Sequence, residues 1–175
     1  MSATAAETAR LQALEALQVL DLPPSATFDQ VVQVASLMCG TPIALVSLVD
    51  SDRLCFVGRT GLDVHQVPSK HSLCDYAILT PQTLLEVRDA SCDARFADSP
   101  LVTGPPGIRF YAGAPLVTSQ GHAIGTLCVI DRKARDLSES QRVALESLAQ
   151  LVMQLMESRQ RELHLQQALA ARGVH

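Results

Sequence analysis

The chain has 175 residues, of which 47% are hydrophobic and 18% are charged, and its formal net charge is −4. This balance excludes an intrinsically disordered chain, and the length suits one domain with some helix to spare. The acidic charge and the lack of any extended Lys/Arg run exclude the basic surface of a nucleic-acid-binding protein, so no nucleic-acid partner is expected.

The amino-terminus and the cysteines indicate where the protein works. The first residues lack the basic start and apolar stretch of a signal peptide, and no segment approaches the ~18 unbroken apolar residues of a membrane span. We expect a cytoplasmic domain without membrane contact, although a parent protein could be anchored elsewhere. The five cysteines are odd in number and include no Cys-x-x-Cys pair, which disfavours a disulfide framework or a structural zinc site.

The first part of the chain predicts two helices. Over residues 8–20, leucines recur every third residue, and the prolines at 23–24 are expected to stop this helix because proline cannot donate to the helical ladder. A second helix is expected to begin at Thr27, with its hydroxyl as the cap and Gln30 completing a capping box. Gly40 supplies the carboxyl-terminal stop.

The next segment predicts the centre of a sheet. Residues 43–49 are apolar except for Ser47 and rich in β-branched side chains, which predicts a buried central strand. A turn follows, and residues 54–59 return as its antiparallel neighbour. Residues 61–69 are expected to form a loop.

Short elements and a long loop come next. Ser72, with Asp75 three residues later, resembles another capping box and opens a short helix through residue 78, and residues 84–88 form a short strand. Residues 89–106 are predicted to be irregular, with one helical turn near 93–96. A loop of this length inside a compact domain usually has a task, such as closing over a site.

Two further strands form the clearest hairpin. Residues 108–117 alternate between two faces, and after a turn residues 122–130 return as the partner strand. One face is expected to carry Ile108, Phe110, Ala112, Ala114 and Leu116, and the other Arg109, Tyr111, Gly113 and Pro115.

The last helix begins at Ser138, with Gln141 completing a capping box. Its apolar stripe has the alternating four- and three-residue spacing of a coiled-coil seam. The stripe contains Ala144, Leu148, Leu151 and Leu155, is interrupted by Ser158 and Glu162, and resumes at Leu165 and Leu169. We expect a parallel homodimer through this helix, with Leu11, Leu14 and Leu17 of the first helix widening the seam.

These elements predict an α+β fold with an antiparallel sheet of about five to six strands, helices mainly on one face and a long C-terminal helix. The expected divisions are 1–24 for the first helix and its proline stop, 25–137 for the core, and 138–175 for a helix that closes the core and then projects. No Ser-His-Asp order, paired catalytic carboxylates or phosphate-binding glycine loop is visible, so we expect no enzymatic activity.

Several sequence segments match the motifs of a known domain family. They are residues 10–24 with the helix of Phe28, PIALVSLVD at 42–50 with Phe56 and Arg59, SLCDYAI at 72–78, and VRDA, DARFAD, RFYAGAPL and GTLCVID between residues 87 and 131. Together they resemble the GAF domain family, small-molecule sensor domains of bacterial histidine kinases, diguanylate cyclases and transcription regulators. The likeness covers about residues 8–157 and implies a GAF/PAS-like sheet.

The resemblance implies a ligand pocket on one face of the sheet, enclosed by the short helix, the long loop and the strands at 54–58 and 109–113. The matching positions are Phe56, Cys74, Tyr76, Asp89, Phe96, Phe110 and Tyr111. The family's ligands are too diverse to name a ligand or cofactor here. Bilin-binding members need a Cys-His pair, which this sequence lacks, and the patterns of cyclic-GMP-binding members and of free-methionine-sulfoxide reductases do not match.

Several residues keep two interpretations. Cys74 is either a packing residue or a ligand-contacting or redox-active thiol, and Cys92 is expected to be exposed. Asp89 either binds a polar ligand or caps the following turn, and Phe96, Phe110 and Tyr111 either line a cavity or fill the core. His71 either touches an anionic ligand or has a surface or capping role.

The leading functional hypothesis is a sensory domain that binds a small molecule or partner and signals through its terminal helices to a downstream kinase or cyclase output. A ligand-free dimerisation module of the same fold is the second hypothesis, and a thiol-based redox sensor is the third.

Overall fold

The computed structural model describes residues 3–23, 25–70 and 72–173. Its centre is an antiparallel sheet of six strands in the order β3-β2-β1-β6-β5-β4. The strands are β1 (Ile43–Val49), β2 (Arg53–Thr60), β3 (Gln66–Pro68), β4 (Leu85–Val87), β5 (Phe110–Val117) and β6 (Ala123–Asp131). The expected α+β fold is confirmed, with β1 and β6 at the centre of the sheet.

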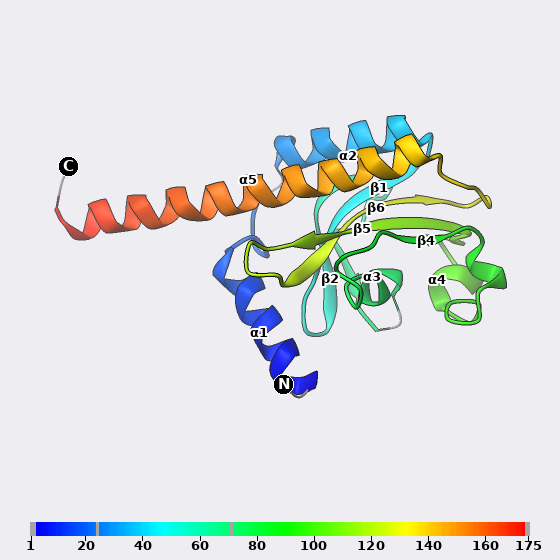
Figure 1. The fold of residues 1–175 in the computed structure, drawn as a ribbon, viewed down its shortest axis with the longest axis horizontal. Coiled ribbons are helices and arrows are strands. Elements are labelled where there is room, and N and C mark those ends of the chain that lie inside the picture. The colour runs from blue at the N-terminus through cyan, green and yellow to red at the C-terminus, as the bar shows by residue number, and fades with distance from the viewer. Residues whose placement is uncertain (1–2, 24, 71, 174–175) are drawn as a thin grey trace.

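Helices cover the two faces of the sheet unequally (Figure 1). The long helices α2 (Ala26–Cys39) and α5 (Glu139–Ala171) lie side by side on one face, and Gln141 Nε2 joins them by donating to Met38 O at 3.0 Å. The short helices α3 (Leu73–Ala77) and α4 (Pro100–Thr103) lie on the other face, and the 3₁₀ turn η1 (Ala90–Cys92) packs into the same core through Ala90. The short elements therefore enclose the face on which a pocket was expected.

Alternation along the strands divides the interior into two cores. On β5, Phe110 and its alternate neighbours face the core beneath α2 and α5, whereas Tyr111 faces the core beneath α3 and the long loop. The predicted alternation of residues 110–116 is thus observed. Ile108 departs from it, because it precedes β5 and packs into the second core.

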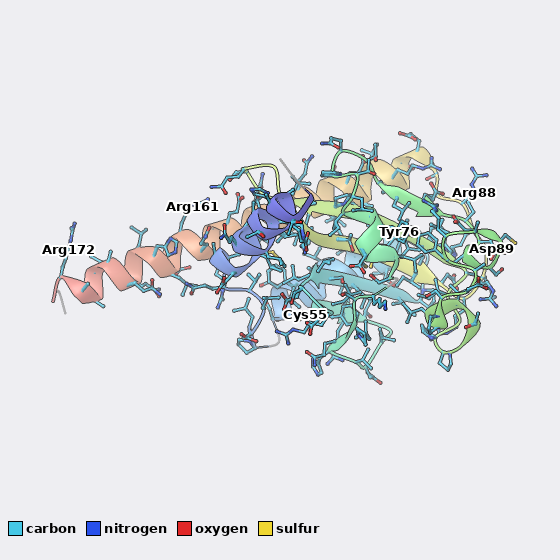
Figure 2. All side chains as sticks on the ribbon, turned by 90° about the horizontal axis from the view of Figure 1, so that it is seen from below. Cys55, Tyr76, Arg88, Asp89, Arg161 and Arg172 are labelled. Carbon is cyan, nitrogen blue, oxygen red and sulfur yellow. The ribbon has the colours of Figure 1, made fainter. Side chains whose placement is uncertain are left out.

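Helix α5 begins as predicted, with Ser138 Oγ accepting from Gln141 N and the Gln141 side chain accepting from Ser138 N. Its first half buries Leu145, Ala149, Val152, Met153 and Met156 against the sheet. Its second half extends beyond the sheet, where Figure 2 shows Arg161 and Arg172. Within the described ranges, no helix is long and apolar enough to cross a lipid bilayer.

Helix α1 (Ala3–Ala16) ends earlier than the sequence predicted. Gln18 has a left-handed backbone with φ of 53°, which ends the helix before the prolines, and Pro24 itself lies outside the described residues. Leu14 and Leu17 are buried in the domain's own core. They are therefore unavailable to the dimer seam that the sequence assigned to them.

Two further local predictions were wrong. Helix α2 begins at Ala26 after Ser25, whose side chain makes no capping bond, so Thr27 lies inside the helix instead of capping it. The expected loop at 61–69 contains β3, an edge strand that pairs with residues 53–55 of β2. Its three residues are too few to show the alternation that identifies a strand.

Candidate functional site

A pocket of about 420 Å³ lies between the sheet and the short elements of the second core. Leu73 and Cys74 of α3 and Leu101 and Pro106 of the long loop contribute to its wall, so the pocket lies between the two segments that the sequence indicated. The other residues that line it are Ile43, Leu45, Leu54, Phe56, Leu62, Val64, Val67, Ser72, Pro105, Ile108, Tyr111, Ile130 and Arg132. Most of this wall is hydrocarbon, which suits a mainly apolar ligand.

Three of the seven candidate residues line this pocket: Phe56, Cys74 and Tyr111. Phe56 comes from β2, Cys74 from α3 and Tyr111 from β5, so the pocket joins segments far apart in the sequence. All three side chains are buried. Tyr111 is only 1% exposed, so it belongs to the core as well as to the pocket wall.

The other four candidates lie elsewhere. Tyr76 packs edge-to-face on Phe96 with ring centroids 4.9 Å apart, and Phe96 is completely buried in the core behind the pocket. Phe110 belongs to the opposite core, which separates it from the pocket by the thickness of the sheet. Asp89 is half-buried near Arg88 at the edge of the molecule, where Figure 2 shows both residues, and it accepts from Ser91 N at 3.0 Å. Asp89 therefore has the capping role.

Polar side chains gather where Cys74 meets the sheet. Tyr111 OH and Thr126 Oγ1 each lie 3.4 Å from Cys74 Sγ, and Cys128 lies close enough to influence the pKa of the same thiol. Ser47 Oγ is completely buried nearby and has no hydrogen-bond partner of ordinary length among the described residues. We refer to Ser47, Cys74, Tyr111, Thr126 and Cys128 as the Cys74 cluster.

The Cys74 cluster changes the acidity of its thiols. The hydrogen bond from Cys128 has the largest influence on Cys74, and with the hydroxyl groups it outweighs burial and lowers the pKa of the Cys74 thiol to about 7. The hydrogen bond to Cys74 and burial both raise the pKa of the Cys128 thiol well above its ordinary value. Burial likewise raises the pKa of Tyr111, so its hydroxyl keeps its proton as a donor.

Strand register explains how the Cys74 cluster forms. Ser47 of β1 pairs with Thr126 of β6, and Cys128 lies two residues farther along β6 on the same face. Gly113 lies opposite Cys128 on β5, and a Cβ at this position would collide with the Tyr111 hydroxyl and ring. The glycine leaves no empty space at this position, because the Tyr111 ring occupies it.

Sequence reasoning missed three members of the Cys74 cluster: Ser47, Thr126 and Cys128. A signal was available in Ser47, the one polar residue of the strand at 43–49. A hydroxyl retained in a fully buried strand usually has a local partner, which directs attention to its neighbours. Pairing Ser47 with Thr126, however, requires the strand order, which only the structure supplies.

Charged groups near the pocket are few. Arg132 is the one charged residue among the described residues that line it, and its Nε donates to Pro106 O at 3.0 Å. In the part of the chain that the structure describes, no group of three or more His, Cys, Asp or Glu side chains is arranged to hold a metal ion. His71 lies outside the described residues.

Comparisons with known proteins agree with this architecture. The model of the family described as GAF domain matches residues 23–156. A cyclic di-GMP phosphodiesterase of Pseudomonas aeruginosa is 44% identical over 148 residues, which are 84% of this chain and 25% of that protein. The chain thus spans a quarter of the length of this curated relative.

Two solved structures share the fold at lower identity. The GAF domain of Acinetobacter phosphoenolpyruvate-protein phosphotransferase has a TM-score of 0.62 at 18% identity, covering 90% of this chain and 95% of its own. Free methionine-R-sulfoxide reductase from Neisseria meningitidis, solved with its substrate, has a TM-score of 0.63 at 21% identity, covering 92% and 96%. These similarities show the fold and leave the ligand open.

Proposed function

This chain belongs to the GAF domain family, and from that premise we propose that it is a sensory domain that binds a small, mainly apolar molecule and reports its presence to a signalling output. The observation that carries the proposal is the pocket of about 420 Å³ between the sheet and α3. Its volume is within the range of small-molecule sites. Its hydrocarbon wall stabilises apolar groups by removing them from water.

The ligand class follows from the groups that line the pocket. A flat or branched hydrocarbon body suits the apolar wall, and a single anionic or strongly polar group suits Arg132. A molecule with several charges would lose hydration without finding partners, so highly charged nucleotides are disfavoured. The pocket therefore supports a metabolite with an apolar body and one polar end.

Two contacts support a route from the pocket to α5. Tyr111 lines the pocket on β5, and the turn after β5 reaches α5 because Ser119 N donates to Glu157 Oε1 at 2.8 Å. At the other end, Arg142 Nε donates to Glu86 of β4 at 2.7 Å. A shift of β5 caused by a ligand would move both contacts, and α5 would carry the change beyond the domain.

The curated relative suggests the output. It is a cyclic di-GMP phosphodiesterase, and this chain corresponds to a quarter of its length. We propose that this chain regulates an output that acts on cyclic di-GMP, which refines the kinase or cyclase output expected from the sequence. The chain itself is proposed to regulate and not to catalyse.

Dimerisation through α5 is the second part of the proposal. Leu165 and Leu169 of α5 are 65% and 52% exposed, and Leu151 is 44% exposed. Leucines in water on one helical stripe favour pairing with another helix. A ligand-free dimerisation module would share this helix and differ only in the pocket, so an experiment on the pocket separates the two hypotheses.

Binding of 8-anilinonaphthalene-1-sulfonate, which has an apolar body and one anionic group, tests the pocket. We expect saturable binding of one dye per chain and a loss of affinity of at least about tenfold in Leu62→Trp, which fills the half-buried pocket rim. The control is Leu79→Trp, at a position that is 73% exposed and away from the pocket wall. Absence of binding, or equal affinity in both variants, would favour the ligand-free module.

A further inference from the structure

The five cysteines are not equivalent in the structure. Cys92 is exposed, whereas Cys39, Cys55, Cys74 and Cys128 are buried. Cys39 and Cys55 belong to the core beneath α2 and α5, where burial raises the pKa of both thiols. Cys74 and Cys128 belong to the other core, where each thiol influences the pKa of the other. These two thiols therefore form a pair that the sequence did not indicate, because their positions are 54 residues apart.

The surroundings of Cys74 favour a thiolate. Tyr111 OH and Thr126 Oγ1 lie 3.4 Å from one another, which is long for an O–H···O bond, and each is also 3.4 Å from Cys74 Sγ. Both hydroxyls therefore direct their protons to the larger sulfur atom. Ser47 Oγ, with no partner of ordinary length among the described residues, adds a third hydroxyl beside it.

The positions of the two thiols give them different access. Cys74 lines the pocket, so a small molecule in the pocket lies against this residue. Cys128 belongs to β6, is 0% exposed and does not line the pocket. A reagent that enters the pocket therefore meets Cys74 first, and Cys128 is placed to react with whatever forms on Cys74.

We propose that Cys74 and Cys128 form a reversible dithiol–disulfide pair that is oxidised by a small apolar hydroperoxide entering through the pocket. The proposal relies on the proposed function only for access through that pocket, and it requires no resident ligand. The oxidant class follows from the apolar wall, which favours a hydrocarbon body carrying the peroxide group.

The chemistry balances in two steps. The Cys74 thiolate attacks the terminal peroxide oxygen, so an S–O bond forms and the O–O bond breaks, and the departing alkoxide leaves as an alcohol by taking up the proton that the thiol released when it ionised. The Cys128 sulfur then attacks Cys74 Sγ, so the S–S bond forms and the S–O bond breaks, and hydroxide leaves with the Cys128 proton as water. The two sulfurs together lose two electrons to the peroxide, and a small dithiol reductant restores both thiols.

Closing the bond would change the pocket. The two sulfurs must approach one another to reach the ~2.05 Å length of a disulfide. Helix α3 has only five residues and is the more easily displaced partner, because Cys128 lies in the paired strand β6. Leu73 of α3 also lines the pocket, so oxidation would alter the space that a ligand occupies.

Peptide mapping of the full chain tests the bond directly. The reduced protein is treated with cumene hydroperoxide, alkylated and digested with trypsin. We expect residues 71–88, which contain Cys74, linked to residues 110–132, which contain Cys128, and released by dithiothreitol. Cys92 falls in the separate peptide 89–95 and reports exposed-thiol oxidation in the same sample. We expect Cys74 to react at least roughly tenfold faster than Cys92 with this apolar oxidant.

Variants separate the roles of the two thiols. Cys128→Ser should stop at a sulfenic acid on Cys74, which dimedone traps, and Cys74→Ser should leave Cys128 reduced. Cys55→Ser, a change at a buried thiol of the opposite core, should form the same linked peptide as the unchanged protein. Circular dichroism of each variant identifies any that fails to fold, and the unchanged protein alone still tests the bond.

The pH profile provides a readout that packing alone would not move. Among the described residues, the titratable groups that face Cys74 are Tyr111 of β5 and Cys128 of β6. Because the pKa of the Cys74 thiol is lowered to about 7, its oxidation rate should rise with pH through that value. Tyr111→Phe removes one donor, so the pKa should rise and the midpoint should move to higher pH.

Recovery of Cys74 and Cys128 as free thiols while Cys92 is oxidised would overturn the proposal, as would a link from Cys74 to any other cysteine. Dye binding to the reduced protein keeps the two proposals distinct. Dye binding without the linked peptide leaves the sensory proposal intact and removes the dithiol pair. The linked peptide without dye binding would support the dithiol pair and contradict the sensory proposal.

Discussion

At the scale of single residues, the pocket depends on a tyrosine lying along its own strand. Tyr111 OH reaches Cys74 Sγ because the ring passes over Gly113, where any side chain would occupy the same space. Phe56, Cys74 and Tyr111 were predictable because each belongs to a recognisable segment of the GAF family. Thr126 and Cys128 were not, because their contacts depend on strand pairing across the sheet.

Gly113→Ala tests this arrangement. The added methyl group must displace the buried Tyr111 ring, so we expect the free energy of unfolding to fall by ~1–3 kcal/mol in urea denaturation. In a Tyr111→Leu background the clash is absent, and the same substitution should cost much less. An equal cost in both backgrounds would show that the tyrosine is not the reason for the glycine.

The role of Tyr111 is best tested by a substitution that retains its buried ring. Its side chain is completely buried, so Tyr111→Ala would remove core packing and cost roughly 3–5 kcal/mol, as aromatic truncations in cores do. That substitution would therefore confuse an effect on ligand affinity with an effect on stability. Tyr111→Phe retains the ring and removes only the hydroxyl, so it is the substitution of choice.

At the scale of elements, the sequence predicted helix starts correctly where a capping residue bonds to a residue close to it in the sequence. The capping box at Ser138 and the single capping bond at Ser72 each join residues three apart, so both partners can be recognised in the sequence. The predictions for helix α1 and strand β3 were wrong because the limits of both elements depend on tertiary contacts. Leu17 and Val19 enter the core only after the chain leaves the helix, and β3 exists only as the partner of β2.

The start of α5 is held to β4 by Glu86, and this link makes an element-scale prediction. Glu86 accepts from Leu137 N at 3.0 Å and from Arg142 Nε at 2.7 Å. Burial alone would raise the pKa of the Glu86 carboxyl, but the hydrogen bonds from Arg142 and Leu137 outweigh it and lower that pKa below its ordinary value. The lowered pKa means that the folded state favours the ionised carboxylate.

Glu86→Gln should therefore reduce the free energy of unfolding by ~1 kcal/mol at pH 7. Because the folded-state pKa is lowered, the stabilisation is present above the unfolded-state pKa and is lost as pH falls through the folded-state value. The difference between the two proteins should shrink correspondingly in acid, measured by urea denaturation across pH. Glu139→Gln is the control, since Glu139 pairs with the same Arg142 but its side chain is 83% exposed, and it should change stability little.

At the scale of the whole molecule, the two faces of the sheet have separate tasks. One face packs α2 and α5 into a continuous core, and the other encloses the pocket with short elements and a loop. Strand β5 contributes to both, with Phe110 on one side and Tyr111 on the other. A change in the pocket therefore acts on the strand whose opposite side supports α5, which is the mechanical basis of the proposed signalling.

Helix α5 has 33 residues, which at ~1.5 Å per residue is about 50 Å and exceeds what the domain covers, as Figure 1 shows. Leu148 and Leu155 of the predicted seam pack partly against the domain's own core, so substituting them would disturb the fold. Leu165 and Leu169 lie beyond that core and remain exposed. They are the better test of a dimer.

We expect the full chain to sediment as a dimer at tens of micromolar, and Leu165→Glu combined with Leu169→Glu to produce a monomer. Each leucine buried between helices contributes roughly 1.5–3 kcal/mol, and carboxylates at the seam would repel one another across it. Leu79→Glu, at an exposed site on the pocket side of the domain, should leave the mass unchanged. A chain ending at Glu157 should associate more weakly than the full chain, because it lacks both leucines. A full chain that remains monomeric, or a doubly substituted chain that still dimerises, would place any interface elsewhere than the projecting half of α5.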